Sequence, residues 1–196
     1  MRRAFLGLWL IILSVSCSQK ENFNIAWTRE QAPEHFTAKF ETIKGDFEVE
    51  VTRKLSPKAA DRFYQLVKHQ YFDDGIFYRV VPGFVAQFGN TDAALMEHWR
   101  AVKIPDEPVI SGNEKGTVSF ARAGKETRDL ELFINLSHNA VLDTLPFEGV
   151  KGFPSFGRVT RGMDVVEKLY SGYAESTMDD PNMYTNWAVF YQKYPK

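Results

Sequence analysis

Apolar and polar residues alternate most clearly in two neighbouring stretches, residues 36–43 and residues 47–52. A period of two is typical of strands that bury one face, and the intervening Lys44-Gly45-Asp46 indicates a hairpin turn. Ser56 and Pro57 then predict the start of a helix, because serine accepts a backbone N–H bond there and proline is tolerated at the first helical position. Apolar residues at helical spacing follow, and they predict a helix lying with one face on a sheet. They are Ala60, Phe63, Leu66 and Val67.

The rest of the chain adds short strands and one more helix. Residues 77–89 predict a strand, a turn at Pro82-Gly83 and a second strand. Residues 90–116 are mostly polar, which indicates a surface excursion with a short helical turn at 94–102. Many short strands with only two helices predict an all-β fold, a closed antiparallel barrel capped by the helices, since closure removes exposed strand edges. The further strands are predicted at Thr117–Ala121, Glu131–Leu136, Ser155–Val159 and Trp187–Tyr191, and the second helix at Gly162–Leu169.

One stretch, FYRVVPGFVAQFG at residues 77–89, places a single cation among apolar side chains with no acidic residue inside the segment. With a period of two, Phe77 and Arg79 share one face of the sheet, which sets a guanidinium beside aromatic side chains at the edge of a pocket. The alternative is an edge-strand arginine whose charged end extends into water. The apolar neighbours on both sides of Arg79 favour the pocket.

The N-terminus has the pattern of an export signal. Arg2 and Arg3 precede an apolar run, Ala4–Val15, that is too short for a membrane span of about 20 residues. Residues 1–16 are therefore interpreted as a signal peptide. Cys17 follows directly and resembles the lipidated first residue of a bacterial lipoprotein, although Ser14 to Ser16 would also suit an ordinary signal peptidase. Residues 17–33 are expected to form a polar tether, and residues 34–196 the folded domain.

Composition excludes several classes of function. Lys and Arg number 24 against 25 Asp and Glu, so there is no basic footprint for nucleic acid. A lone cysteine excludes an internal disulfide and a cysteine-based metal cage. The four histidines are scattered, with none at ligand-like spacing from another, so no metal site and no cofactor are expected. They are His35, His69, His98 and His138.

The motif FxRVxPGFxxQxG at residues 77–89 resembles the signature of the cyclophilin family of peptidyl-prolyl isomerases. Later blocks are similar to family elements in the same order, and the resemblance runs from about Phe36 to the C-terminus. It implies an eight-stranded antiparallel barrel capped by two helices, and a protein that acts on proline-containing polypeptides. The later blocks are GTVSFARA at 116–123, ELFIN at 131–135, Leu142-Asp143, Phe156-Gly157 and MDVV at 163–166.

The resemblance also implies roles for individual residues. Arg79 would be the catalytic donor, and Phe84, Phe133 and Leu142 would line a proline socket, with Gln87 and the Ala121 backbone orienting the peptide. By composition alone, the phenylalanines and Leu142 would instead be plain barrel core.

Some positions depart from the family pattern. Glu131 replaces a glutamine, and a carboxylate there would pair with Arg79, holding the guanidinium while partly neutralising its field. Arg122 replaces an asparagine, Val141 an aromatic residue, and Phe153 a histidine at the socket rim.

Two functions remain open at this point. The first is a peptidyl-prolyl isomerase that assists the folding of exported proteins. The second is a binding module that grips proline-containing segments with negligible turnover, which the departures at Glu131, Val141 and Phe153 favour. In either case the protein is expected to be a monomer that faces the periplasm or the cell exterior, held at a membrane surface through lipidated Cys17.

Overall fold

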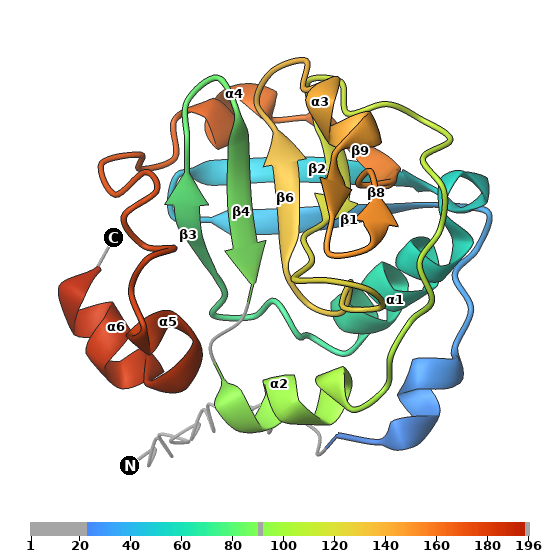
Figure 1. Ribbon diagram of the computed structural model, residues 1–196, viewed down its shortest axis with the longest axis horizontal. Coiled ribbons are helices and arrows are strands. Elements are labelled where there is room, and N and C mark those ends of the chain that lie inside the picture. Colours follow the sequence, from blue (N-terminus) through green and yellow to red (C-terminus); the bar gives the residue numbers. More distant parts are fainter. Residues whose placement is uncertain (1–22, 90–91, 195–196) are drawn as a thin grey trace, which may run out of the picture.

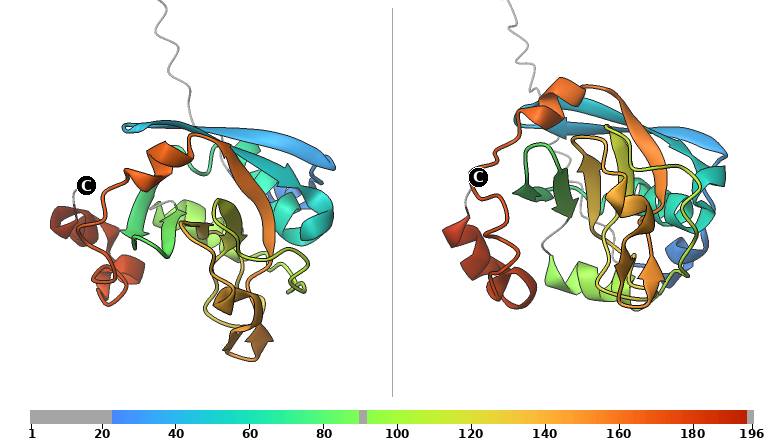
Figure 2. Two further views of the ribbon diagram at one scale, coloured as in Figure 1. Left: turned by 90° about the horizontal axis from the view of Figure 1, so that it is seen from above. Right: turned by 45° about the horizontal axis from the view of Figure 1, so that its top comes forward.

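The computed structural model describes residues 23–89 and 92–194, and its centre is a curled seven-stranded antiparallel sheet. Figure 2 shows the sheet bent around a concave interior. The strand order is β1-β2-β9-β5-β6-β4-β3, with hydrogen-bonded neighbours throughout. The strands are β1 (His35–Thr42), β2 (Gly45–Thr52), β3 (Ile76–Val80), β4 (Val85–Gly89), β5 (Thr117–Phe120), β6 (Leu132–Asn135) and β9 (Ser155–Arg161), and a separate two-stranded hairpin pairs β7 (Pro146–Phe147) with β8 (Val150–Lys151).

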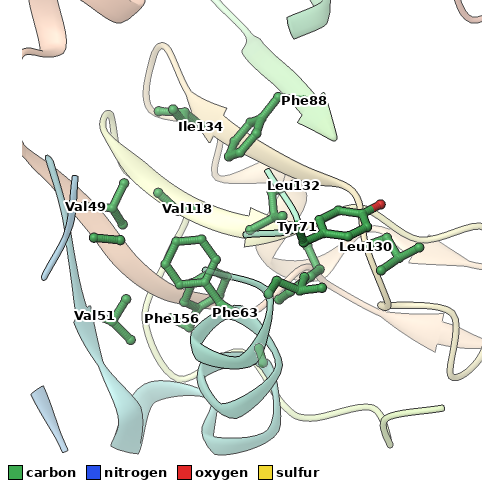
Figure 3. Packing of buried hydrophobic residues seen from close by; sticks show 14 of the residues in the cluster. Val49, Val51, Phe63, Tyr71, Phe88, Val118, Leu130, Leu132, Ile134 and Phe156 are labelled. Atoms are coloured by element: carbon green, nitrogen blue, oxygen red, sulfur yellow. The ribbon is translucent and has the colours of Figure 1, made fainter. Parts of the chain in front are cut away.

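Short helices surround the sheet. The longest is α1, which packs its apolar stripe into the main core, as Figure 3 shows for Phe63. Its ring lies 5.1 Å from that of Phe156 in β9. The helical segments are the 3-10 turns η1 (Ile25–Arg29) and η2 (Arg53–Leu55), and the helices α1 (Pro57–Lys68), α2 (Ala93–Arg100), α3 (Val141–Thr144), α4 (Met163–Glu167), α5 (Asn182–Thr185) and α6 (Trp187–Lys193).

The closed eight-stranded barrel expected from the sequence is wrong. In the described part of the chain the sheet is a half-barrel, whose edge strands β1 and β3 do not pair with each other. The predicted last strand, Trp187–Tyr191, is instead part of helix α6. Asn186 accepts a hydrogen bond from the Val189 N–H at the start of this helix, which satisfies one of the free backbone donors there.

The spacing of two buried residues explains why this segment is helical. Phe190 and Tyr194 are four residues apart, so they lie on one face of α6, and both pack against Met183 and Tyr78. Figure 1 shows α5 and α6 beside β3, outside the curled sheet. A hollow of about 860 Å³ remains between the β1 and β3 ends of the sheet, with Phe40, Phe72 and Phe77 in its lining.

The polar tether expected over residues 17–33 is contradicted from Phe23 onward. Phe23 and Trp27 pack against the main core, and Trp27 stacks on His69 with 4.0 Å between the ring centroids. Their large aromatic side chains bury apolar area against the core, which stabilises this segment on the domain. The folded domain thus begins about ten residues earlier than expected. Cys17, the apolar run Ala4–Val15 and the rest of residues 1–22 lie outside the described residues.

A half-buried carboxylate caps the start of helix α1, in place of the predicted serine cap. The Glu107 carboxylate accepts the Lys58 and Ala59 N–H groups at 2.8 and 3.2 Å, whereas the Ser56 hydroxyl donates to Glu107. Glu107 also pairs at 3.1 Å with Arg128, whose side chain is fully buried. The polar excursion and the charged loop after β5 are therefore both fixed to the start of α1.

We expect Glu107→Ala to lower the free energy of unfolding by about 3 kcal/mol, since it removes a helix cap and one of the two carboxylate partners of the buried Arg128 guanidinium. Urea unfolding followed by circular dichroism measures this. Glu41→Ala, at a carboxylate that is 74% exposed, is the matched control and should change stability by less than about 0.5 kcal/mol. Equal effects of the two substitutions would contradict the capping role.

Candidate active site

An irregularity in β3 decides where Arg79 lies. The register with β4 shifts between Phe77 and Arg79, which is a β-bulge. Phe77 and Val80 belong to the main core, whereas Tyr78 packs with the C-terminal helices and Arg79 contacts Phe84. The expectation that Phe77 and Arg79 share a face is therefore wrong, because the extra residue changes the phase of the alternation. The bulge turns Arg79 away from the core and toward the socket residues.

The predicted socket residues do come together. Phe133 and Leu142 form a small buried cluster with Val85, and Phe84 and Ala121 pack against it. This cluster, which we call the socket, is separate from the main core. Its residues come from β4, β6, α3 and the ends of neighbouring strands, and they are buried apart from the main core. Leu145 and Phe153 complete the socket.

Arg79 lies at the edge of the socket with its charge held in place. Its guanidinium carbon is 5.4 Å from the centroid of the Phe84 ring, and its Nη1 donates to Gln87 Oε1 at 3.1 Å. Gln87 is directly opposite Arg79 in the β3–β4 ladder. The Arg79 side chain is 17% exposed. The alternative of an arginine extending freely into water is thus excluded.

The carboxylate paired with Arg79 is Glu175, a residue that the sequence did not single out. Arg79 Nε donates to Glu175 Oε2 at 2.8 Å, and Nη2 donates to Oε1 at 2.7 Å. The two residues are 96 positions apart, and Glu175 lies in the loop between α4 and α5. No local pattern could have indicated this pair.

Glu131, expected to pair with Arg79, makes other contacts. Its carboxylate accepts hydrogen bonds from Tyr78 Oη and from Arg100 Nη2, both at 3.0 Å. Glu131 precedes β6 and lies toward Gly89 at the far end of β4, whereas Arg79 is opposite Gln87. Burial raises the pKa of the Glu131 carboxyl above its ordinary value, and the Arg100 charge opposes this effect. The expected Glu131–Arg79 pair is therefore wrong.

A network of buried side-chain amides lies behind the socket. The Asn113 side-chain amide donates to Asp143 at 2.8 Å and to the Phe153 carbonyl at 2.9 Å. Asn135 donates to Asn113 at 3.1 Å, and Asn139 donates to both Asn135 and the Phe84 carbonyl. This amide network joins the backbone on opposite sides of the socket. Of these asparagines only Asn135 lies at a strand end, and the sequence does not reveal its partners.

The rim of the socket is formed by the two departures from the family pattern at Arg122 and Phe153. The Phe153 ring packs edge-on to Phe133 at 5.9 Å, and the Arg122 guanidinium lies 4.4 Å from the Phe153 ring centroid. Arg122 is 9% exposed, and burial lowers its pKa. Gly152, directly before Phe153, lets the backbone approach Asp143 closely: its φ is 71°, and a Cβ there would lie 2.2 Å from the Asp143 carbonyl oxygen.

The described residues include neither a cluster suited to hold a metal ion nor a helix suited to span a membrane. Across residues 23–89 and 92–194, no group of three or more His, Cys, Asp or Glu side chains is arranged to hold a metal ion. Over the same residues, none of the helices combines the length and the apolar character needed to cross a bilayer.

Comparison with known proteins agrees with this geometry. Residues 37–186 match the family model described as cyclophilin type peptidyl-prolyl cis-trans isomerase/CLD. A peptidyl-prolyl cis-trans isomerase of Acinetobacter baylyi is 32% identical over 130 residues, which cover 65% of this chain and 68% of the relative. Peptidyl-prolyl cis-trans isomerase CYP18-2 of Arabidopsis thaliana is 32% identical over 141 residues, covering 70% of this chain and 82% of the relative.

Solved structures show the same fold. A crystal structure of a Cryptosporidium parvum cyclophilin type peptidyl-prolyl cis-trans isomerase superposes with a TM-score of 0.56 at 21% sequence identity, covering 70% of this chain and 86% of that chain. A second structure of that protein, in the presence of the dipeptide Ala-Pro, has the same TM-score and covers 69% of this chain. The sequence motif, the assembled socket and the family match over 37–186 together show that this chain belongs to the cyclophilin-type peptidyl-prolyl cis-trans isomerases.

Proposed function

We propose that the isomerase reaction of this chain is carried by Arg79, which stabilises a twisted X-Pro amide whose proline ring sits in the socket. The observation that supports this most directly is the position of Arg79, held by Gln87 and lying against Phe84 at the socket edge. Phe84, Phe133 and Leu142 supply the apolar walls for the ring, and the segment at Ala121 lies beside them to align the peptide.

The chemistry needs no covalent step. Rotation about the X-Pro bond is slow because amide resonance must be broken, at a barrier of about 18–20 kcal/mol. In the twisted state the proline nitrogen regains a lone pair, which a fixed cationic donor stabilises more than either planar form. A hydrogen bond to a charged group is worth about 1.5–3 kcal/mol, which corresponds to one to two decades in rate.

Arg79 has donors to spare for this role. A guanidinium carries five N–H groups, and contacts with described residues use three of them, two to Glu175 and one to Gln87. Within the described part of the chain, one N–H on Nη1 and one on Nη2 thus remain for a substrate. Because arginine stays protonated and its fork is rigid, these donors keep a fixed direction.

A second function, a binding module with negligible turnover, is favoured by two observations. Val141, where the family pattern has an aromatic residue, is 59% exposed and is not part of the socket cluster. Glu175 also occupies two of the Arg79 donors. A module of this kind would bind proline peptides with similar affinity whether or not Arg79 is present, and would not accelerate their isomerisation.

Replacing Arg79 with alanine should lower kcat/KM for an X-Pro peptide by one to two decades, because the substitution removes the donor to the twisted amide. A protease-coupled assay over a panel of X-Pro peptides measures this. Near-normal circular dichroism would show that the fold is kept. An unchanged rate would remove Arg79 from the mechanism, and the absence of turnover in the unmodified protein would favour the binding module.

Glu131→Gln should leave kcat within about twofold, because Glu131 does not contact Arg79. Its effect should appear in stability. The folded state raises the pKa of Glu131, so the folded protein holds this proton more tightly, and the unmodified protein loses stability as pH rises above about 4.3. The stability of the variant relative to the unmodified protein should therefore increase between about pH 4 and about pH 7.

Urea unfolding at the two pH values tests this, with the isomerase assay run in parallel. A relative stability that falls with rising pH would mean that the pair with Arg100 outweighs the burial of Glu131. A tenfold change in kcat would mean that Glu131 acts on the site after all.

We further propose that the chain is exported and held at a membrane surface through a lipid on Cys17, where it assists the folding of exported proteins as a monomer. The apolar run Ala4–Val15 and the position of the lone cysteine support this. Acyl chains contribute about 0.8 kcal/mol per buried methylene, so a multiply acylated Cys17 would remain bound to the bilayer.

Mass spectrometry of the mature N-terminus is expected to find an acylated Cys17, and Cys17→Ser should move the protein from the membrane fraction to the soluble fraction. An unmodified N-terminus at Cys17 would support simple cleavage by a signal peptidase instead. The retention of residues 1–16 would exclude both.

A further inference from the structure

We propose that Glu175 is a positioning residue for Arg79, delivered by the C-terminal part of the chain. This inference rests on the proposed role of Arg79 and extends it. The Glu175 carboxylate bonds to Nε and Nη2 along one edge of the guanidinium, at 2.8 and 2.7 Å. Gln87 holds Nη1 from β4, and the Phe84 ring lies against the guanidinium. These contacts fix the group from three directions.

Glu175 occupies one edge of the Arg79 guanidinium and leaves another part of the group available to a substrate. A carboxylate across Nε and Nη2 leaves the opposite end of the fork, with one N–H on each terminal nitrogen. Glu175 therefore restricts the orientation of Arg79 without using all of its donors. A guanidinium that is already oriented loses less conformational freedom when it bonds to the twisted amide.

The loop that carries Glu175 is itself attached to the residue beside Arg79. Tyr78 packs in one cluster with Met183, Phe190 and Tyr194. The Tyr194 hydroxyl in turn donates to the Ser176 carbonyl at 3.1 Å, directly after Glu175 in the chain. Tyr78, next to Arg79 in the chain, is thus packed with Tyr194, and Tyr194 is bonded to the residue that follows Glu175. Because of these contacts, the packing of α5 and α6 sets the position of the Glu175 carboxylate.

The backbone is strained directly before Glu175. Ala174, directly before Glu175, has a φ of 43°, a left-handed conformation that is costly for a residue with a Cβ. The Ala174 N–H is bonded to the Ser171 carbonyl, and the Ser176 N–H to the Tyr173 carbonyl, so this turn is held by its own hydrogen bonds. The strained turn aims the Glu175 side chain at Arg79.

The alternative effect of Glu175 is to damp the field of Arg79. Glu175 is 55% exposed, and water screens an ion pair of this kind strongly. Screening weakens the neutralising effect of the carboxylate, whereas the geometric restraint from two hydrogen bonds remains. Positioning is therefore the larger effect, and the loss of Glu175 should slow the reaction.

We expect Glu175→Ala to lower kcat by about three- to tenfold with a smaller change in KM, because the restraint acts on the donor to the twisted amide. Glu175→Gln keeps one acceptor for Arg79 and should fall between the alanine variant and the unmodified protein. Asp179→Ala is the matched control, since this exposed carboxylate lies in the same loop and no bond joins it to Arg79 in the described structure. It should leave kcat within about twofold.

A double-mutant cycle separates positioning from a general effect on folding. In the Arg79→Ala background, Glu175→Ala should have no further effect on kcat, because the group that it orients is gone. The same fractional loss in both backgrounds would overturn the proposal, since Glu175 would then act through the fold. A rise in kcat for Glu175→Ala, or no change, would overturn it as well, the rise by showing that the carboxylate damps Arg79.

The proposed role of Arg79 and the proposed role of Glu175 can be disproved separately. If Arg79→Ala keeps full activity, the proposed mechanism is wrong whatever Glu175 does. If Arg79→Ala is impaired and Glu175→Ala is not, only the positioning role is wrong. Urea unfolding of each variant shows whether the loop remains folded, and Glu175→Gln keeps the test valid if the alanine variant unfolds.

Discussion

The shape of the socket depends on one constraint, the need of several buried amides for hydrogen-bond partners. Asn113 and Asn135 are fully buried, and Asn139 is nearly so. Each finds partners only when the polar excursion, β6 and the segment around α3 are all in place. A buried polar group without a partner costs about 1–3 kcal/mol, so alternative placements of these segments are disfavoured. Strand pairing alone would not hold the backbone of Phe153 or Phe84 at the socket, because both lie outside the strands.

The position of Arg79 depends on a different set of contacts. A bulge in β3 points it away from the core, and two acceptors then restrain it, one in the neighbouring strand and one in a distant part of the chain. Its partners differ in character: Gln87 is buried in a strand, whereas Glu175 is on an exposed loop. The site thus combines a rigid wall with one component that belongs to the C-terminal helices. If Arg79 acts as proposed, without a nucleophile, such restraint is the main contribution of the protein to catalysis.

Local signals predicted much of the fold. The β1–β2 hairpin follows from alternation around Lys44-Gly45-Asp46, and α1 follows from its apolar stripe. The socket was predicted through the family motif, since alternation alone could not separate Phe133 from the core. The last segment failed because Trp187, Val189 and Tyr191 alternate like a strand, while the packing that decides its structure uses Phe190 and Tyr194 at helical spacing.

Other errors have a common physical origin in contacts that are distant in sequence. Glu131 was expected to pair with Arg79 because it stands where the family pattern has a glutamine, but the partner comes from 96 residues away. The bulge that changes the phase of β3 leaves no trace in the residue pattern, because it depends on the pairing with β4. The role of Glu107 at the start of α1 was hidden for the same reason, since Ser56 offered a local cap of the expected type.

The docking of Phe23 and Trp27 onto the core has a consequence for the reach of the proposed anchor. If Cys17 carries the lipid, only six peptide spans separate it from Phe23, a leash of at most about 20 Å. A domain of this size has a radius of gyration of about 15 Å, so the leash is shorter than the globule is wide. The enzyme could not sweep a large volume of the surrounding compartment. It would encounter those chains that emerge or linger close to the bilayer surface.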